Sequence, residues 1–278
     1  MNESCCQFGE FRQLAGIITE PASSARRGAL VLVSAGLLPK FGPFRLYAEL
    51  ARRLSSDGFL TLRFDLGGIG DSGQAYANHP LEERTRLEIR AAVDYLMARY
   101  ELEGVVLGGL CSGAEDSFRS AESDVRVTGV VMIDPFSYRT HGWKWRHFLY
   151  RGRRRLKRAL GLYRPIPRGA DRGKSLVSYE YMPHSESSRI LTTLVKRKVR
   201  SHFVYTGGAR EVFNHEHQLA AMFSNVDFDG LVSLDHFPQM DHTQLLEEDR
   251  RVLVEAIARR LALTSARQLP PRASRDTS

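Results

Sequence analysis

The sequence predicts an α/β fold in which helices flank a mostly parallel central sheet. Strand-like apolar runs alternate with helix-like segments along most of the 278 residues, a pattern typical of parallel sheets that are covered on both faces. A glycine-framed turn, GLCSG at 109–113, follows the apolar run 105–107 after one further glycine. Such a turn between a strand and a helix is a common feature of α/β enzymes.

Each predicted strand is a short apolar run that ends at turn residues. The runs are 16–19 (a strand or hairpin), 29–33, 59–65, 105–110, 127–133, 202–206 and 231–237. Ser-Ala-Gly follows the second, the turn-rich segment LGGIGDSG continues the third, and Asp-Pro and Gly-Gly follow the fifth and sixth.

Apolar residues at a helical period predict the helices between these strands. In 44–56, Leu46, Leu50 and Leu54 share one face. Residues 81–100 read as a long amphipathic helix, another helix begins at 112, and 243–263 form a closing helix.

The pattern divides the chain into a core, an insertion and a tail. Residues 1–136 and 201–263 carry the alternating elements and form the predicted α/β core. Residues 137–200 interrupt it and are interpreted as an inserted helical cap. The tail, 264–278, is polar and rich in Pro and Arg, which predicts disorder.

The composition predicts a cytoplasmic location. No apolar run approaches the roughly 20 residues of a membrane span, and the first residues, MNESCCQFGEF, lack the basic and apolar regions of a secretion signal. The three cysteines, Cys5, Cys6 and Cys111, do not form a disulfide framework. A free thiol persists in a reducing cytoplasm.

Within the turn, the glycine spacing selects Cys111 as the candidate nucleophile. Gly109 and Gly113 lie two residues before and two residues after it, where side chains would collide across a sharp turn. The neighbouring Ser112 has Leu110 and Ala114 at the same positions. The alternative is a buried structural cysteine beside an ordinary turn.

Three further stretches resemble the α/β-hydrolase superfamily, and within it the serine aminopeptidase-like hydrolases. They are VLVSAGLLPKFGPFRLYAELARRL (31–54), FLTLRFDLGGIGDSG (59–73) and HFPQMDHT (236–243), and the resemblance spans roughly residues 12–262. In having cysteine at the nucleophile position, the chain resembles dienelactone hydrolases, polyhydroxyalkanoate synthases and some thioesterases. It also resembles hydrolase-like proteins found with exopolysaccharide or natural-product assembly lines.

The resemblance implies a histidine base after the last strand. It also implies an acidic residue that orients this histidine and lies between the nucleophile and the histidine in the chain. His242 occupies the position of the base, and His236 is the near rival. Glu211, in the turn after 202–206, is favoured as the acid that orients the histidine. Asp134, at the end of the strand 127–133, remains the competitor, because the family more often has Asp after a single Gly where this chain has Gly-Gly and then Glu211.

An oxyanion hole needs two backbone N–H groups directed at the developing negative charge. The expected donors are the amides of Leu37, in the loop after 29–33, and of Ser112, directly after the nucleophile. No metal or organic cofactor is implied, since His215 and His217 lack a third ligand nearby.

The predicted cap is strongly basic. Residues 137–200 contain 18 Lys or Arg and 3 Asp or Glu, whereas the whole chain has a net charge of +8. The segment WKWRHFLYRGRRRLKRALGLYR (143–164) mixes aromatic and basic residues and is expected to form a pair of basic amphipathic helices. Its expected partners are a coenzyme A thioester, an acidic carrier protein that bears an acyl thioester, or an anionic membrane surface. Nucleic acid is disfavoured because no recognition motif accompanies the charge, and a solvated cap face is the alternative.

These residues together predict a hydrolase that acts on a small-molecule ester, thioester or amide through an acyl-cysteine on Cys111. Two alternatives stay open. The same acyl-cysteine could pass its acyl group to an acceptor other than water, which makes the protein an acyltransferase. A non-catalytic protein could also retain this fold for docking to a carrier protein or a membrane.

Overall fold

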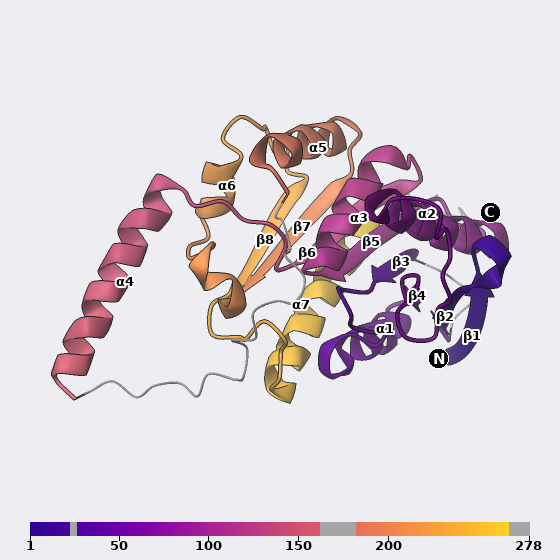
Figure 1. Ribbon diagram of the computed structural model, residues 1–278, viewed down its shortest axis with the longest axis horizontal. Helices are drawn as coiled ribbons and strands as arrows, with labels where there is room; N and C mark the ends of the chain where they lie inside the picture. Colours follow the sequence, from indigo (N-terminus) through magenta and orange to yellow (C-terminus); the bar gives the residue numbers. More distant parts are fainter. Residues whose placement is uncertain (23–26, 162–181, 267–278) are drawn as a thin grey trace, which may run out of the picture.

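An eight-stranded sheet forms the centre of the computed structural model, which describes residues 1–22, 27–161 and 182–266 (Figure 1). Its strands lie in the order β1-β2-β4-β3-β5-β6-β7-β8. The bounds are Asn2–Phe8 (β1), Leu14–Glu20 (β2), Gly28–Val33 (β3), Phe59–Phe64 (β4), Val105–Leu110 (β5), Val127–Ile133 (β6), Arg200–Thr206 (β7) and Val232–Phe237 (β8). The six strands β3 to β8 are parallel to one another, and β2 is antiparallel to both β1 and β4.

Strand β1 was not expected from the sequence. Its residues, NESCCQF, are mostly polar or exposed, and only Phe8 is buried. The strand forms by antiparallel backbone pairing with β2, in which Cys5 lies opposite Ile17. Such edge pairing needs no apolar run, so hydrophobic periodicity does not detect it.

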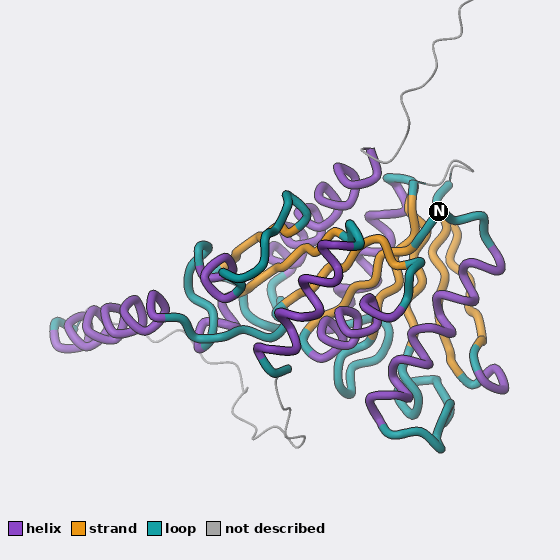
Figure 2. Tube along the Cα trace, turned by 90° about the horizontal axis from the view of Figure 1, so that it is seen from above, coloured by secondary structure: helices purple, strands orange, loops and turns teal. Residues whose placement is uncertain are grey.

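Helices cover both faces of the sheet, as Figure 2 shows from above. Helices α1 (Leu46–Ser56) and α7 (Glu247–Ala266) pack on one face, and α2 (Leu81–Arg99), α3 (Ser112–Ser123) and α5 (His184–Lys196) pack on the other. Side chains alternate accordingly along β3, where Leu30 and Leu32 face α1 and α7, while Val31 and Val33 face the opposite layer. This arrangement fixes the carboxyl ends of the parallel strands at one edge of the sheet.

The two helices described within 137–200 differ in their surroundings. Helix α5 is part of the core layer, because its residues Ile190, Leu191 and Leu194 are buried against α3 and the sheet. Helix α4 (His141–Ala159) projects away from the body in both views (Figures 1 and 2). In place of the expected helix pair over 143–164, the described part of this segment forms a single helix that ends at Ala159, and residues 162–164 lie outside the described residues.

The closing helix α7 runs to Ala266, three residues beyond its expected end. Residues 267–278 of the expected tail lie outside the described residues. A short helix, α6 (Gln218–Met222), was also not expected.

Candidate active site

Cys111 occupies a sharp turn between β5 and α3. Its backbone angles, φ 53° and ψ −119°, are strained for a residue with a side chain. A Cβ on Gly109 would lie 2.4 Å from the carbonyl carbon of Gly113, and a Cβ on Gly113 would lie 2.5 Å from the carbonyl oxygen of Val33. The first glycine therefore permits the turn itself, and the second permits the close approach of α3 to the end of β3.

A buried tyrosine on α1 supports this turn from beneath. The hydroxyl of Tyr47 accepts a hydrogen bond from the Leu110 amide at 2.8 Å and donates one to the Val33 carbonyl at 3.1 Å. The Cys111 amide donates to the Ile133 carbonyl at 2.8 Å. The amides of Leu110 and of Cys111 itself are thus linked to the two neighbouring strands, β3 through Tyr47 and β6 directly. Sequence reasoning missed Tyr47, which reads as one more apolar residue of its helix.

The imidazole of His242 lies against the carboxylate of Asp134. Nδ1 of His242 is 2.8 Å from Oδ2 of Asp134, whose side chain is only 2% exposed. The amide and the hydroxyl of Thr206 donate to the same carboxylate at 2.6 and 2.5 Å. Asp134 therefore lies at the end of β6, with its carboxylate fixed by three donors when Nδ1 carries a proton.

The pKa of His242 is raised from its usual value of 6.5 to about 10. The hydrogen bond to Asp134 is the largest cause, and the side chain of Cys111 is the second, while burial opposes both. The cationic imidazolium is therefore the resting form at neutral pH. This form places a positive charge beside Cys111.

Glu211 does not take the position that the sequence analysis favoured for it. It lies at the end of a short 3-10 helix, Gly207–Glu211, and is exposed. Asp134 is instead the carboxylate against His242, so the structure brings the competitor, and not the favoured acid, to the histidine. In the same turn, a Cβ added to Gly208 would lie 2.4 Å from the Cβ of His242. The histidine loop therefore packs directly on Gly208 and leaves no room for a side chain at that position.

Buried polar contacts hold the loop that carries His242. The side-chain amide of Gln244 donates to the His242 carbonyl at 2.7 Å. Arg250, on α7, donates to the carbonyls of Gln244 and Leu245 at 3.0 and 2.8 Å. Sequence reasoning missed Gln244 and Arg250, and their contacts with loop carbonyls leave no sequence pattern.

The two expected oxyanion donors border the turn at Cys111. The Gly36 amide donates to the Ser112 hydroxyl at 2.8 Å, which ties the loop after β3 to the start of α3. Within the described residues, no group accepts a hydrogen bond from the amides of Leu37 and Ser112. Both amides are therefore available to a bound ligand, and Leu37 itself is 74% exposed.

Known structures share this architecture. An esterase domain from Rhodothermus marinus matches with a TM-score of 0.59 and 16% identity, over 94% of this chain and 99% of that one. An α/β serine hydrolase homologue from Coxiella burnetii matches with a TM-score of 0.60 and 16% identity, over 94% and 97%. The chain has the α/β-hydrolase fold.

Another α/β serine hydrolase, described as lacking a lid, comes from Xanthomonas campestris and matches with a TM-score of 0.56 and 13% identity, over 98% of this chain and 97% of that one. No protein-family model matches the chain, and no curated protein matches it. Two of these structures are named as a serine hydrolase or its homologue, whereas this chain carries Cys111 in the strained turn.

Three further histidines, His236, His215 and His217, lie in surroundings that differ from that of His242. His236 lies on β8 with its ring nearly perpendicular to that of Phe213, and its pKa is lowered, mainly by burial. His215 and His217 stack on each other with ring centroids 4.9 Å apart. No group of three metal-binding side chains occurs among the described residues. None of the helices within those residues has the length and apolar character to cross a membrane.

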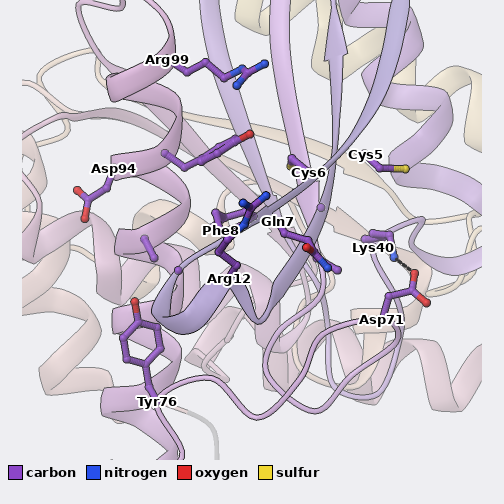
Figure 3. Close-up of a pocket in the computed structure, with 15 residues that line it drawn as sticks. Cys5, Cys6, Gln7, Phe8, Arg12, Lys40, Asp71, Tyr76, Asp94 and Arg99 are labelled. Carbon is purple, nitrogen blue, oxygen red and sulfur yellow. Dashed lines mark hydrogen bonds and ion pairs between the residues drawn. The ribbon is translucent and has the colours of Figure 1, made fainter.

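A groove of about 1100 Å³ lies at the β1 edge of the fold (Figure 3). Its lining includes Cys5, Cys6, Arg12 and Arg99, and Lys40 forms an ion pair with Asp71 at its margin. Burial raises the pKa of the Cys6 thiol to about 11, so this thiol stays protonated at neutral pH. Cys111 is not part of this groove.

Proposed function

We propose that this protein hydrolyses an ester, thioester or amide through a covalent acyl-cysteine on Cys111. His242 acts as the acid and base, and Asp134 orients it. The observation that carries the proposal is the Cys111 turn with His242 held at 2.8 Å from Asp134 on the neighbouring strand end. Relatives of the same fold that are named esterase or serine hydrolase support the reaction class.

In the first half of the reaction, the thiolate sulfur of Cys111 attacks the substrate carbonyl carbon. The carbonyl oxygen becomes an oxyanion, which the amides of Leu37 and Ser112 bind. The imidazolium of His242 then protonates the leaving alcohol, thiol or amine as its bond to carbon breaks. The acyl group remains on Cys111 as a thioester, and His242 is left neutral.

In the second half, neutral His242 removes a proton from a water molecule that attacks this thioester. The carbon–sulfur bond breaks, the carboxylic acid leaves, and the thiolate and imidazolium are restored. Asp134 keeps Nδ1 protonated throughout, so that Nε2 is the nitrogen that exchanges protons. An amine, alcohol or thiol in place of water would give the acyltransferase reaction.

Cys111, and not Ser112, is assigned as the nucleophile for two reasons. The strained backbone belongs to Cys111, while Ser112 is the first residue of α3. The Ser112 hydroxyl is also engaged by the Gly36 amide. A thiolate beside an imidazolium is already nucleophilic and needs less activation than a hydroxyl.

The test is acyl labelling of a variant in which Cys5→Ser and Cys6→Ser leave Cys111 as the sole cysteine. This protein is mixed with acetyl coenzyme A and with p-nitrophenyl acetate at pH 7, and its intact mass is followed over time. We expect one acetyl group on Cys111 that Cys111→Ala abolishes, with acylation about 10²–10⁴-fold slower in His242→Ala.

The fate of the adduct distinguishes the remaining reactions. Decay in water alone supports the hydrolase, and decay only with an added amine or thiol replaces it with the acyltransferase. An adduct on Ser112 would overturn the assignment of the nucleophile. No adduct with either compound, together with full function of Cys111→Ala in the cell, would favour the non-catalytic docking protein.

A further inference from the structure

Helix α4 has an apolar stripe along its outer side that no other described element covers. Trp145, Phe148, Leu149 and Leu156 recur at helical spacing and share one face. Trp145 is 65% exposed and Phe148 68%. A Cβ added to Gly152, which lies on the same face, would meet no atom within 4 Å. Exposed aromatic and aliphatic side chains in one stripe mark an interaction surface.

The contacts of α4 with the body lie on the opposite side of the helix. Trp143 is buried, its carbonyl accepts a hydrogen bond from the side chain of Asn214, and the Arg139 guanidinium lies 4.7 Å above its ring centroid. Tyr150, on the same side, faces Arg210. At 100° per residue these positions point about 140–160° away from Trp145. The apolar stripe therefore faces outward.

Basic residues border this stripe on both sides. Helix α4 contains eight Lys or Arg and no acidic residue. Helical spacing places Lys144, Arg151 and Arg155 along one border and Arg153 along the other. A helix with Trp, Phe and Leu on one face and Lys and Arg around it is typical of helices that lie in the surface of an anionic bilayer.

We propose that α4 docks this protein onto an anionic membrane surface, with the apolar stripe inserted between the lipids and the bordering cations at the phosphate headgroups. The stripe runs along most of a helix that is about 28 Å long at 1.5 Å per residue. An acidic carrier protein would pair with the basic residues but would leave the Trp, Phe and Leu side chains exposed. A bilayer satisfies the charge and the apolar stripe together, and the exposed Trp, Phe and Leu side chains therefore favour it.

The chain provides its own reporter for this contact. Its two tryptophans, Trp143 and Trp145, both lie on α4. Trp143→Phe leaves Trp145 as the only tryptophan, on the outward stripe. We expect its emission to shift to shorter wavelength with vesicles of phosphatidylglycerol and phosphatidylcholine, and not with vesicles of phosphatidylcholine alone. Sedimentation with the same vesicles gives the affinity.

Paired variants separate this surface from general charge. Arg151→Glu with Arg155→Glu should weaken binding at least about 30-fold, because each basic residue near an anionic surface contributes about fivefold. The matched control, Arg86→Glu with Arg90→Glu, changes the net charge equally but alters exposed positions on α2. This control should retain most of the vesicle binding.

A gain-of-binding variant tests the stripe itself. Gly152→Leu extends the apolar face and should tighten vesicle binding by about tenfold relative to Gly152→Ala. Gly152→Ala is the control, because Ala and Leu raise the helix propensity by similar amounts. Equal binding to both vesicle types, equal loss in both arginine pairs, or binding to an acidic acyl carrier protein without binding to vesicles would overturn the proposal. Cys111→Ala should bind vesicles normally, so this result is independent of the proposed chemistry.

Discussion

At the residue scale, the contact between His242 and Asp134 determines which protons the candidate site holds. The carboxylate is buried and accepts hydrogen bonds from Thr206 as well as from the imidazole. The imidazole is 32% exposed, so it remains accessible from solvent while its Nδ1 is fixed. A cation is thus kept beside Cys111 at neutral pH.

The two carboxylates that the sequence left open can be separated by matched amide variants. Asp134→Asn should slow the acylation of Cys111 by about 10–100-fold, because an amide cannot stabilise the imidazolium. Glu211→Gln should leave the rate within about twofold, because Glu211 is exposed and does not orient the imidazole. Burst kinetics with p-nitrophenyl acetate give both rates. Equal losses in the two variants would contradict the assignment of Asp134.

The raised pKa of His242 also predicts how stability depends on pH. The unfolded chain loses this proton near pH 6.5, whereas the folded protein holds it up to about pH 10. The contribution is therefore fully present below pH 6.5 and is lost as the pH rises through 10. Because the imidazole is one-third exposed, we expect on the order of 1–2 kcal/mol after solvent screening.

Urea unfolding between pH 6 and 10 measures this contribution. The difference in free energy of unfolding between the unchanged protein and His242→Gln should shrink as the pH rises. A difference that stays constant over this interval would show that His242 is not charged in the folded protein.

At the scale of elements, the central strands were predictable because they are apolar runs that carry their own signal. The turn at Cys111 was predictable because its two glycines stand where a side chain would collide with nearby backbone. The acid was not predictable, because tertiary packing decides which of the two carboxylates lies against Nδ1 of His242. The edge strand β1 and the support from Tyr47 likewise arise from contacts between distant parts of the chain.

The link between α1 and the Cys111 turn can be tested at Tyr47. Tyr47→Phe removes the acceptor of the buried Leu110 amide and should lower the free energy of unfolding by about 1–3 kcal/mol. Tyr150→Phe is the matched control, because this side chain is 45% exposed, and it should change stability by less than about 0.5 kcal/mol. Urea unfolding at pH 7 compares the two. Equal stability of both variants would argue against this role of Tyr47.

At the scale of the whole molecule, the segment 137–200 contains two kinds of helix. Helix α5 closes one layer of the sheet, whereas α4 contacts the body chiefly near its first turns. The proposed cap boundaries remain a prediction, but the two helices should respond differently to truncation of an apolar side chain.

Leu191→Ala, on α5, should cost about 2–5 kcal/mol, because it leaves a cavity in the core. Phe148→Ala, on α4, should change stability by less than about 0.5 kcal/mol, because this ring is exposed in the free protein. Thermal unfolding without vesicles measures both. A large loss for Phe148→Ala would indicate that α4 packs against the body in solution.

The close contact between Gly208 and His242 also constrains how this protein can be changed by mutation. Moving the acid from the end of β6 to position 208, in the turn after β7, would require a side chain where an added Cβ would lie 2.4 Å from the Cβ of His242. An Asp at position 208 alone would displace the loop that carries His242. The carboxylate could then not orient the imidazole. The two placements of the acid are therefore separated by at least two coupled substitutions, and an engineer who begins from this chain must move the loop first.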